Sequence, residues 1–448
     1  MTILTICIVA VFCLGYFFIA IESLTKINKA AIALLMFVAC WTLFMLDPGQ
    51  YLPGLGQNVG LAVGSVIEHH LGTTSTTLFF LMGAMTIVEL VDQSGGFNFV
   101  RSTLQTTSKR KLLWRIAWMT FLLSAVLDNL TTSIVMVMIL NKLVKDKGDR
   151  LVYASLVVIA ANSGGAFSPI GDVTTIMIWN KGLVTAGGVI KEIIMPSVVS
   201  MVIPALLLQY RLKGNLDTVK SGCNEGSQAD CLSDKQRKII FCIGVGGLIF
   251  VPIFKSITHL PPFVGILLVL GVLWTITELF YRHLSHHAEK GSVQKRVTNM
   301  LSRIDMSTIL FFLGILMAVA SLETIGVLTR LGNGLNTAFD GNHFAVTGII
   351  GVLSSIVDNV PLVAGCMGMY PMAQIGDFAQ DGIFWQLLAY CAGVGGSMLI
   401  IGSAAGVVVM GLEKITFGWY LKNISWIVLV GYLAGIAAYY LQRVVLCL

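Results

Sequence analysis

Long apolar runs separated by short polar segments recur along the whole chain. Most of these runs approach the roughly 20 residues that an α-helix needs to cross a bilayer. The pattern therefore predicts an all-α polytopic membrane protein. We expect membrane-crossing helices at 3–21, 30–46, 76–92, 192–210, 306–322 and 423–441.

The composition agrees with this pattern. Of 448 residues, 56% are hydrophobic and 12% are charged, whereas soluble domains carry about 25% charged residues. The net charge of +6 is spread over short loops, where it indicates orientation in a membrane rather than a nucleic-acid partner. The first run is not a cleavable signal, because no basic region precedes it and no cleavage site follows it before Lys26. The partner expected for this surface is membrane lipid.

Three matches at nearly one separation indicate an internal duplication. FFLMGAM begins at Phe79 and FFLGILM at Phe311, which is 232 residues later. An Asp-Asn pair begins at Asp128 and again at Asp358, 230 residues apart, and a Gly-Gly pair recurs at a separation of 231. We expect a first repeat at 1–212, a cytoplasmic linker at 213–236 and a second repeat at 237–448.

Each half is expected to contain five transmembrane spans, one of them broken by glycines (151–179; 384–411), and one re-entrant hairpin (112–141; 344–369). Cytoplasmic loops accumulate Lys and Arg. The segments that bound the second hairpin contain neither residue, so its ends face outside. The second repeat is therefore inverted relative to the first, which is typical of secondary transporters. Basic residues flank the first hairpin on both sides and place its ends in the cytoplasm: Arg101, Lys109, Arg110, Lys111, Lys142, Lys145, Lys147 and Arg150.

The hairpin tips carry the main candidate chemistry. A carboxylate in the middle of a bilayer costs about 2.5–3.5 kcal/mol on insertion scales and is rarely without a role. Asp128 and Asp358 would bring two carboxylates to the midplane, and Asn129 and Asn359 add amide oxygens. Such oxygen ligands suit a hard cation such as Na⁺ or Li⁺. The alternative is that each Asp-Asn pair merely caps a turn. Nearby hydroxyls are Ser124, Thr131, Thr132, Ser133, Ser354 and Ser355.

The broken spans supply a second set of oxygen atoms. Pro169 and Gly171 favour an interruption of the helix in ANSGGAFSPIGDVTT. Exposed carbonyls there could ligate a cation. The second copy, GVGGSMLIIGSAAG, has Ser403 where the first has Asp172, so the halves are chemically unequal. The side chains expected beside the break are Asn162, Asp172, Thr174 and Thr175.

Two further acids, Glu89 and Glu323, lie at the ends of the third spans. Either they relay protons or they reach the membrane interface as helix-end residues. Asp305, at the start of a span, is interpreted as a helix cap.

These residues suggest a mechanism of competition. Desolvation and nearby like charges favour the protonated carboxyl group, whereas a bound cation favours the ionised form. Na⁺ and protons would therefore displace one another at Asp128, Asp358 and Asp172, with the two Asn residues as further Na⁺ ligands. Alternating access between inverted halves would turn this competition into exchange. No cofactor is expected beyond the transported Na⁺, Li⁺ and H⁺.

The motifs resemble the NhaD-type sodium/proton antiporters of the ion transporter superfamily. The resemblance implies Na⁺(Li⁺)/H⁺ antiport and a bacterial inner membrane location, with related forms in chloroplast envelopes. That family often carries His where Ser94 stands, so a pH-sensing role for that histidine does not follow for this chain. The motifs are FFLMGAMTIVELVD, SAVLDNLTTSIVMV, VIAANSGGAFSPIGDVTT, SSIVDNVPLVA and CAGVGGSMLIIGSAAGV. The functional residues implied are Ser124, Asp128, Asn129, Asn162, Asp172, Thr174, Thr175, Asp358 and Asn359.

Other functions remain open on the sequence. A sodium-coupled carboxylate symporter of the same superfamily is the nearest alternative, although its hairpin tips are uncharged and suit an anionic substrate. Export of arsenite or another small solute is a further alternative. An intramembrane aspartyl protease would need a Tyr-Asp and a Gly-x-Gly-Asp motif, which are absent, so we expect a transporter and not an enzyme. The sequence allows a homodimer without selecting one.

Overall fold

The computed structural model describes residues 2–52, 59–97, 100, 103–212, 214–215, 232–285 and 305–445. Most of the expected linker 213–236 lies outside these residues. Within them the chain is helical, and the only β-type pairing is an isolated bridge between Ser108 and Asn215.

The first half contains two hairpin helices and one span that is split in two. Its elements are α1 (Ile3–Ala20), α2 (Glu22–Thr25), α3 (Lys29–Phe44), η1 (Pro48–Gln50), α4 (Val59–Gln93), α6 (Lys109–Ser124), α7 (Asn129–Leu143), α8 (Lys147–Ala166), α9 (Val173–Asn180) and α10 (Ala186–Gln209).

The elements of the second half also include a hairpin followed by a split span. They are α11 (Asp234–Thr258), α12 (Pro262–Ser285), α14 (Met306–Thr324), α15 (Val327–Ala338), α16 (His343–Leu353), α17 (Asn359–Met369), α18 (Ile383–Gly395), α19 (Ala404–Glu413), α20 (Phe417–Tyr420), η3 (Leu421–Ser425), α21 (Trp426–Tyr440) and η4 (Leu441–Val445).

The molecule has the surface of a multi-pass membrane protein. Six helical stretches in the described residues are long and apolar enough to cross a bilayer. Large apolar side chains point outward from them and from the shorter helices, among them Leu35 at 73% exposure and Ile257 at 71%. An apolar surface of this extent suits lipid rather than water.

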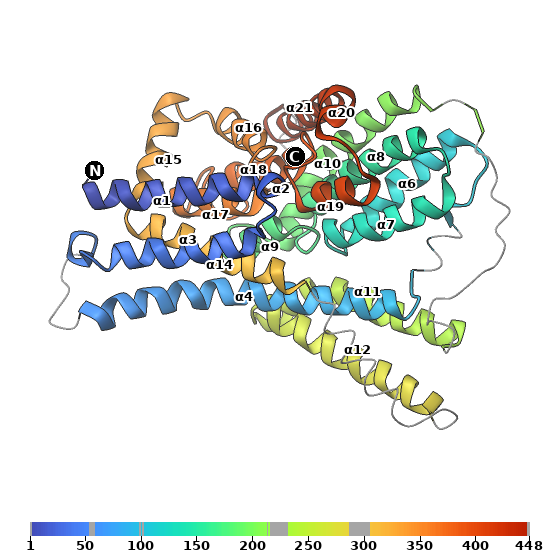
Figure 1. The fold of residues 1–448 in the computed structure, drawn as a ribbon, viewed down its shortest axis with the longest axis horizontal. Helices are drawn as coiled ribbons and strands as arrows, with labels where there is room; N and C mark the ends of the chain where they lie inside the picture. The colour runs from blue at the N-terminus through green and yellow to red at the C-terminus, as the bar shows by residue number, and fades with distance from the viewer. Residues whose placement is uncertain are drawn as a thin grey trace.

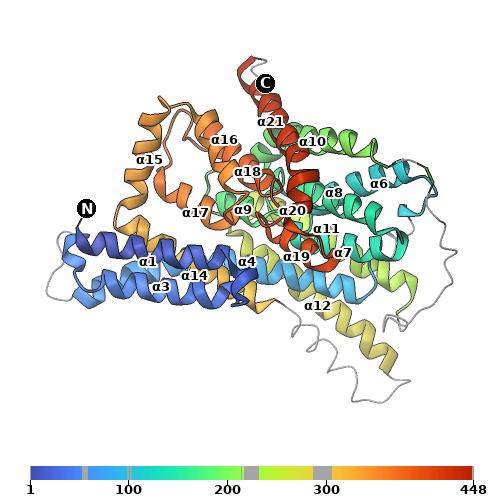
Figure 2. The ribbon, with the colours of Figure 1, turned by 45° about the horizontal axis from the view of Figure 1, so that its top comes forward.

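Two groups of helices lie side by side (Figures 1 and 2). We call α1, α3, α4, α11, α12 and α14 the scaffold, and α6–α10 together with α16–α21 the core. The core contains both hairpins and both split spans. Figure 1 shows α6 and α7 on one side of the short helices α9 and α19, and α16 and α17 on the other side. The two hairpins thus enter the core from opposite sides.

The structure differs from the expected elements in three places. The third span of the first half was expected at 76–92, but α4 already begins at Val59; its 35 residues extend over about 50 Å, well beyond the bilayer core of about 30 Å. Residues 331–338, expected as loop, belong to α15, whose polar Asn333 and Asn336 obscured a helical pattern. The closing span of the second half, expected at 423–441, begins earlier, at Phe417, and passes through the π-helical segment η3.

Matching contacts hold each hairpin against its split span. Ser124 Oγ donates to the Ala161 carbonyl at 2.6 Å, and Ser354 Oγ donates to the Ala392 carbonyl at 2.8 Å. Both pairs recur at the separation of the sequence repeat. The same contact therefore fixes the tip of each hairpin.

Close backbone contacts accompany these hydrogen bonds. A Cβ atom at Gly164 would collide with the Phe121 carbonyl, and one at Gly395 would collide with the Gly351 carbonyl. The glycines are thus required because each split span lies directly against the backbone of a hairpin helix.

We predict that Gly164→Ala lowers the stability of the fold by about 1–3 kcal/mol, the usual cost of overpacking a buried contact. The midpoint of thermal unfolding in detergent would measure the loss. Gly187→Ala is the matched control, because a Cβ there meets open space and the midpoint should stay the same or rise. Equal midpoints for both variants would contradict the packing argument.

Candidate functional site

Four helix N-termini meet in the core, and each is capped by a polar side chain. α7 begins after Asp128, α9 after Asp172, α17 after Asp358 and α19 after Ser403. The first N–H groups of a helix lack backbone partners and carry partial positive charge. Asp and Ser are favoured caps, so the same residues that interrupt the helices also gather three carboxyl groups in one region.

Asp172 is the centre of this region and is only 1% exposed. One carboxylate oxygen, Oδ1, accepts a hydrogen bond from the Thr174 amide at 3.0 Å. The other, Oδ2, accepts from Asn129 Nδ2 at 3.1 Å and from Asn359 Nδ2 at 3.4 Å. The asparagine that follows each tip aspartate therefore contacts a single buried carboxylate from opposite hairpins.

Asn162 extends the network across both split spans. Its Oδ1 accepts from Asn129 Nδ2 at 3.0 Å, and its Nδ2 donates to Ser397 Oγ and Ser403 Oγ, both at 2.9 Å. Ser403 Oγ also accepts from the Gly406 amide at 3.2 Å. We call Asn129, Asn162, Asp172, Asn359, Ser397 and Ser403 the Asp172 centre.

Buried hydroxyls without a hydrogen-bond partner lie in the helices around this centre. Thr132 and Ser133 lie near the start of α7, and Thr175 lies in the first turn of α9. The hydroxyl oxygens of all three are buried. An enclosed hydroxyl without a partner costs free energy. These oxygens are available to a water molecule or a cation. Among the described residues, no cluster of three His, Cys, Asp or Glu side chains is placed to hold a metal ion.

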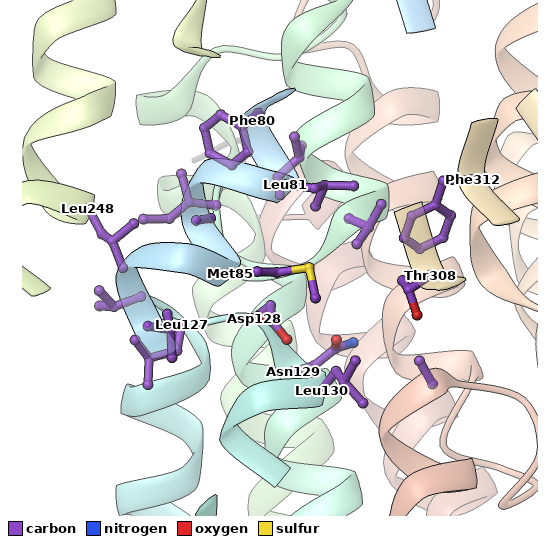
Figure 3. A pocket seen from close by; sticks show the side chains of 17 residues that line it. Phe80, Leu81, Met85, Leu127, Asp128, Asn129, Leu130, Leu248, Thr308 and Phe312 are labelled. Carbon is purple, nitrogen blue, oxygen red and sulfur yellow. The ribbon is translucent and has the colours of Figure 1, made fainter. Parts of the chain in front are cut away.

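Asp128 lines a cavity and forms its hydrogen bonds with Thr131 instead of with the Asp172 centre. Its carboxylate accepts from the Thr131 amide and from the Thr131 hydroxyl, both at 2.7 Å. The adjoining cavity of about 50 Å³ is mainly apolar and includes Met85, Thr308 and Phe312 (Figure 3). We call this space the Asp128 cavity. Asn129 lines this cavity as well and also contacts Asp172, so the tip of the first hairpin joins the cavity to the Asp172 centre.

Asp358 forms an ion pair that the sequence did not suggest. Its Oδ2 lies 3.3 Å from Nζ of Lys29, at the start of scaffold helix α3. A second cavity of about 70 Å³ adjoins this pair and includes Glu22 and Ser403. At the tip of the second hairpin, the residue that contacts Asp172 is Asn359 and not Asp358.

The remaining predicted residues occupy supporting positions. Ser124 and Ser354 attach the hairpins to the split spans, as described above. Glu89 accepts from Gln93 at 3.0 Å near the end of α4. Glu323 is about 4.0 Å from Lys181 and lines a third cavity of about 210 Å³ with His69 and His70.

Two features of the site concern single residues. Asp305 accepts from the Thr308 amide at 3.1 Å, which confirms it as the cap of α14. Ser94 is buried and donates to the Leu90 carbonyl at 2.7 Å.

Lys29 and Ser397 belong to the site but escaped the sequence analysis. Lys29 precedes an apolar run, so it was indistinguishable from an ordinary loop lysine. Ser397 follows the Gly-Gly pair of the second half, and the loss of helical pattern at the break was the only available signal.

We predict that Asn162→Ala destabilises the protein by about 1–3 kcal/mol, because it leaves buried donors and acceptors without partners. The unfolding midpoint in detergent measures this. Asn333→Ala, on the exposed surface of α15, serves as control and should change the stability by less than about 0.5 kcal/mol. Equal effects at both positions would contradict a structural role for the network.

Comparison with known proteins assigns the family. A family model described as "Citrate transporter" matches residues 16–386. "Sodium/proton antiporter 1" of Arabidopsis thaliana is 43% identical over 431 residues, covering 96% of this chain and 71% of that protein. "Na(+)/H(+) antiporter NhaD" of Vibrio parahaemolyticus is 32% identical over 386 residues, covering 80% of this chain and 88% of that protein.

A solved structure shares the fold. The crystal structure of the YdaH transporter of Alcanivorax borkumensis aligns with a TM-score of 0.60 and 12% sequence identity, covering 91% of this chain and 97% of that one. The named relatives are transporters rather than enzymes. The chain therefore belongs to the citrate transporter family and, within it, to the NhaD-type sodium/proton antiporters.

Proposed function

We propose that this protein exchanges Na⁺ for H⁺ across its membrane, with Li⁺ as a second transported cation. The observation that carries the proposal is the buried carboxylate of Asp172, which accepts amide hydrogen bonds from both hairpin tips. Relatives named as sodium/proton antiporters support it. Asp128 and Asp358, one residue before the two asparagines, are further sites of competition between Na⁺ and protons.

The two asparagines give the site a way to accept a cation. In the structure their Nδ2 groups donate to Asp172. An amide carries an acceptor oxygen beside its donor nitrogen, so rotation of the side chain would turn its oxygen toward a cation held by Asp172. The buried hydroxyls of Thr132, Ser133 and Thr175 would add further oxygen ligands. Such a set of oxygens suits Na⁺ and Li⁺.

Competition with protons follows from burial. A desolvated carboxyl group favours its neutral form, and a bound cation favours its ionised form. Arrival of Na⁺ would therefore release a proton, and arrival of a proton would release Na⁺. The exchange needs no cofactor beyond the transported ions.

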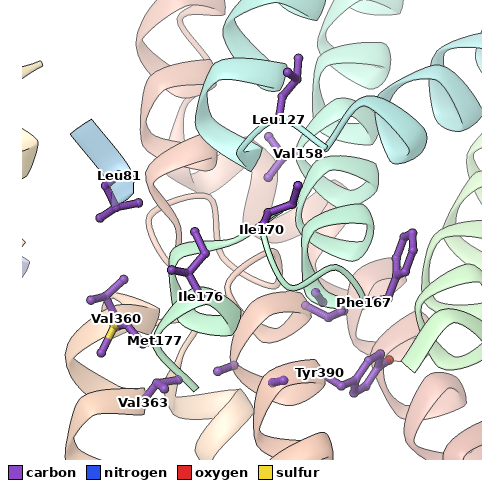
Figure 4. Close-up of a cluster of buried hydrophobic side chains, with 14 of the residues drawn as sticks. Leu81, Leu127, Val158, Phe167, Ile170, Ile176, Met177, Val360, Val363 and Tyr390 are labelled. Carbon is purple, nitrogen blue, oxygen red and sulfur yellow. The ribbon is translucent and has the colours of Figure 1, made fainter. Parts of the chain in front are cut away.

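An apolar cluster supplies a barrier for alternating access. Leu81 and Ile176 line the Asp128 cavity, whereas Met177 lines the 210 Å³ cavity that includes Glu323. Figure 4 shows Leu81, Ile176 and Met177 in one buried cluster with Val360. Movement of the core against the scaffold would open this cluster to one side at a time. In this scheme Glu323 lies on the route of the ions.

Basic residues at one end of the core helices indicate the orientation of the protein in its membrane. Lys109 begins α6, Lys142 lies in the last turn of α7, and Lys147 begins α8. This basic end is placed in the cytoplasm. A bacterial inner membrane and a homodimer stay predictions, and the relatives include both plant and bacterial proteins.

Carboxylate symport is the second candidate, because the matching family model is described as a citrate transporter. The charges of the site argue against it. Asp172 and Asp128 would repel a carboxylate anion, and Lys29 is already paired with Asp358. Addition of citrate or succinate in the transport assay distinguishes the two functions.

We predict that Asp172→Asn weakens Na⁺-driven proton flux by about 10- to 100-fold, the loss expected for one charged ligand worth roughly 1.5–3 kcal/mol. Asparagine is an equally good helix cap, so the substitution removes charge and keeps the fold. Proteoliposomes with an acidic interior and a fluorescent pH indicator provide the measurement. Na⁺ should dissipate the gradient in the wild type, and citrate should not.

Asp146→Asn is the matched control, since Asp146 also caps a helix, α8, but is exposed. Its flux should equal that of the wild type. Near-normal flux in Asp172→Asn would refute the role of the buried carboxylate, and citrate-dependent Na⁺ uptake by the wild type would favour symport.

A further inference from the structure

The tip aspartates of the two hairpins have different partners, although they occupy equivalent positions. Asp128 is held by the amide and the hydroxyl of Thr131. The residue equivalent to Thr131 is Pro361, which has neither an amide N–H nor a hydroxyl. Asp358 is left with one backbone hydrogen bond, from the Val360 amide at 3.3 Å. Its carboxylate therefore needs another partner.

Lys29 provides that partner from the scaffold. Its Nζ is 3.3 Å from Asp358 Oδ2, and the two side chains are 23% and 16% exposed. The same Nζ lies 4.3 Å from the centre of the Phe311 ring. The Lys29 amide donates to Glu22 Oε1 at 3.1 Å. The ammonium group thus lies over Phe311 of scaffold helix α14, and Glu22 of the short helix α2 holds the backbone at the start of α3.

The pair exists in one half only. Lys29 begins α3, and the corresponding position of the second half, 231 residues later, is Leu260. The structure shows no ion pair for Asp128 within the part of the chain that it describes. One tip carboxylate is neutralised from inside the protein, and the other is not.

This pair is directly connected to the Asp172 centre. Asn359, next to Asp358, donates to Asp172 at 3.4 Å. Ser403, which lines the cavity beside Lys29 and Asp358, accepts from Asn162. A cation bound at Asp172 would therefore raise the positive charge close to the Lys29 ammonium group. Repulsion between them would weaken the ion pair.

We propose that Lys29 is a positioning residue that acts as a tethered cation: it occupies Asp358 and holds the core against the scaffold until the transported cation displaces it. The inference rests on the proposed exchange of Na⁺ for H⁺. Lys29 lowers the apparent affinity for Na⁺ and favours its release, because the ammonium group re-forms the pair as the cation leaves.

The test compares Lys29→Gln, Lys29→Arg and Lys29→Met in proteoliposomes, with proton flux measured against Na⁺ concentration. Loss of the competing charge should lower the KM for Na⁺ by about 3- to 10-fold and should also lower the maximal rate, because release becomes slower. Lys29→Arg keeps the charge and should retain both values near those of the wild type. Lys29→Met keeps an unbranched side chain without the charge and should behave like Lys29→Gln.

Lys26→Gln is the matched control, because Lys26 is exposed and precedes Lys29 by three residues; it should behave like the wild type. Equilibrium binding of radioactive Na⁺ to detergent-solubilised protein gives a second measurement, in which Lys29→Gln and Lys29→Met should bind more tightly. In an Asp358→Asn background, Lys29→Gln should cause no further change in Na⁺ binding.

The outcomes separate this inference from the proposed function. An unchanged or lowered affinity for Na⁺ in both Lys29→Gln and Lys29→Met would overturn the tethered-cation role, while a wild type that exchanges Na⁺ for protons would leave the proposed function intact. A failure of Lys29→Gln to fold leaves Lys29→Met to decide. A wild type without Na⁺-driven proton flux would refute the proposed function itself.

Discussion

The burial of carboxyl groups where helices are interrupted is the constraint on which the rest of the structure depends. A helix that starts inside a membrane exposes N–H groups that lipid cannot satisfy. This protein starts four helices within its core and caps three of them with Asp and one with Ser. The helix N-termini stabilise the negative charge of the carboxylates, and the carboxylates satisfy the N–H groups. The residues that interrupt the helices are therefore the same ones that bring the acidic groups together.

Several contacts around the site recur at the spacing of the repeated sequence motifs, whereas the side chains at its centre differ between the two halves. The serine hydrogen bonds and glycine contacts recur in both halves. Asp172 is matched by Ser403, however, and Thr131 by Pro361. Two buried carboxylates facing each other at the centre would repel strongly in a medium of low dielectric constant. Replacement of one by a serine leaves a single charge, which both asparagines can reach.

Among the described residues, two ion pairs cross the boundary between scaffold and core. The Lys29–Asp358 pair joins α3 to the second hairpin, and the Lys181–Glu323 contact joins α9 to α14. The first is close to the Asp172 centre, and the second lines the largest of the three cavities described above. Both pairs join elements that must separate or slide if the site is to open to alternate sides. Both ion pairs therefore connect the scaffold to the core.

The sequence alone determined the membrane-spanning character, the two hairpins and the interrupted spans, whereas the division into two inverted repeats stays a prediction. These features depend on local properties, namely apolar length, the spacing of repeated motifs, Asp at a helix start and the effects of Pro and Gly on the backbone. It also named Asn129, Asn162, Asp172, Asn359 and Ser403, which lie together at the centre, because residues beside helix interruptions are confined to one level of the membrane; it missed Ser397. Only the tertiary structure decided which of two adjacent tip residues contacts Asp172, because that depends on the direction in which each side chain leaves its helix. The pairing of Lys29 with Asp358, which are 329 positions apart in the chain, likewise arises from packing of the scaffold against the core, and no local pattern encodes it.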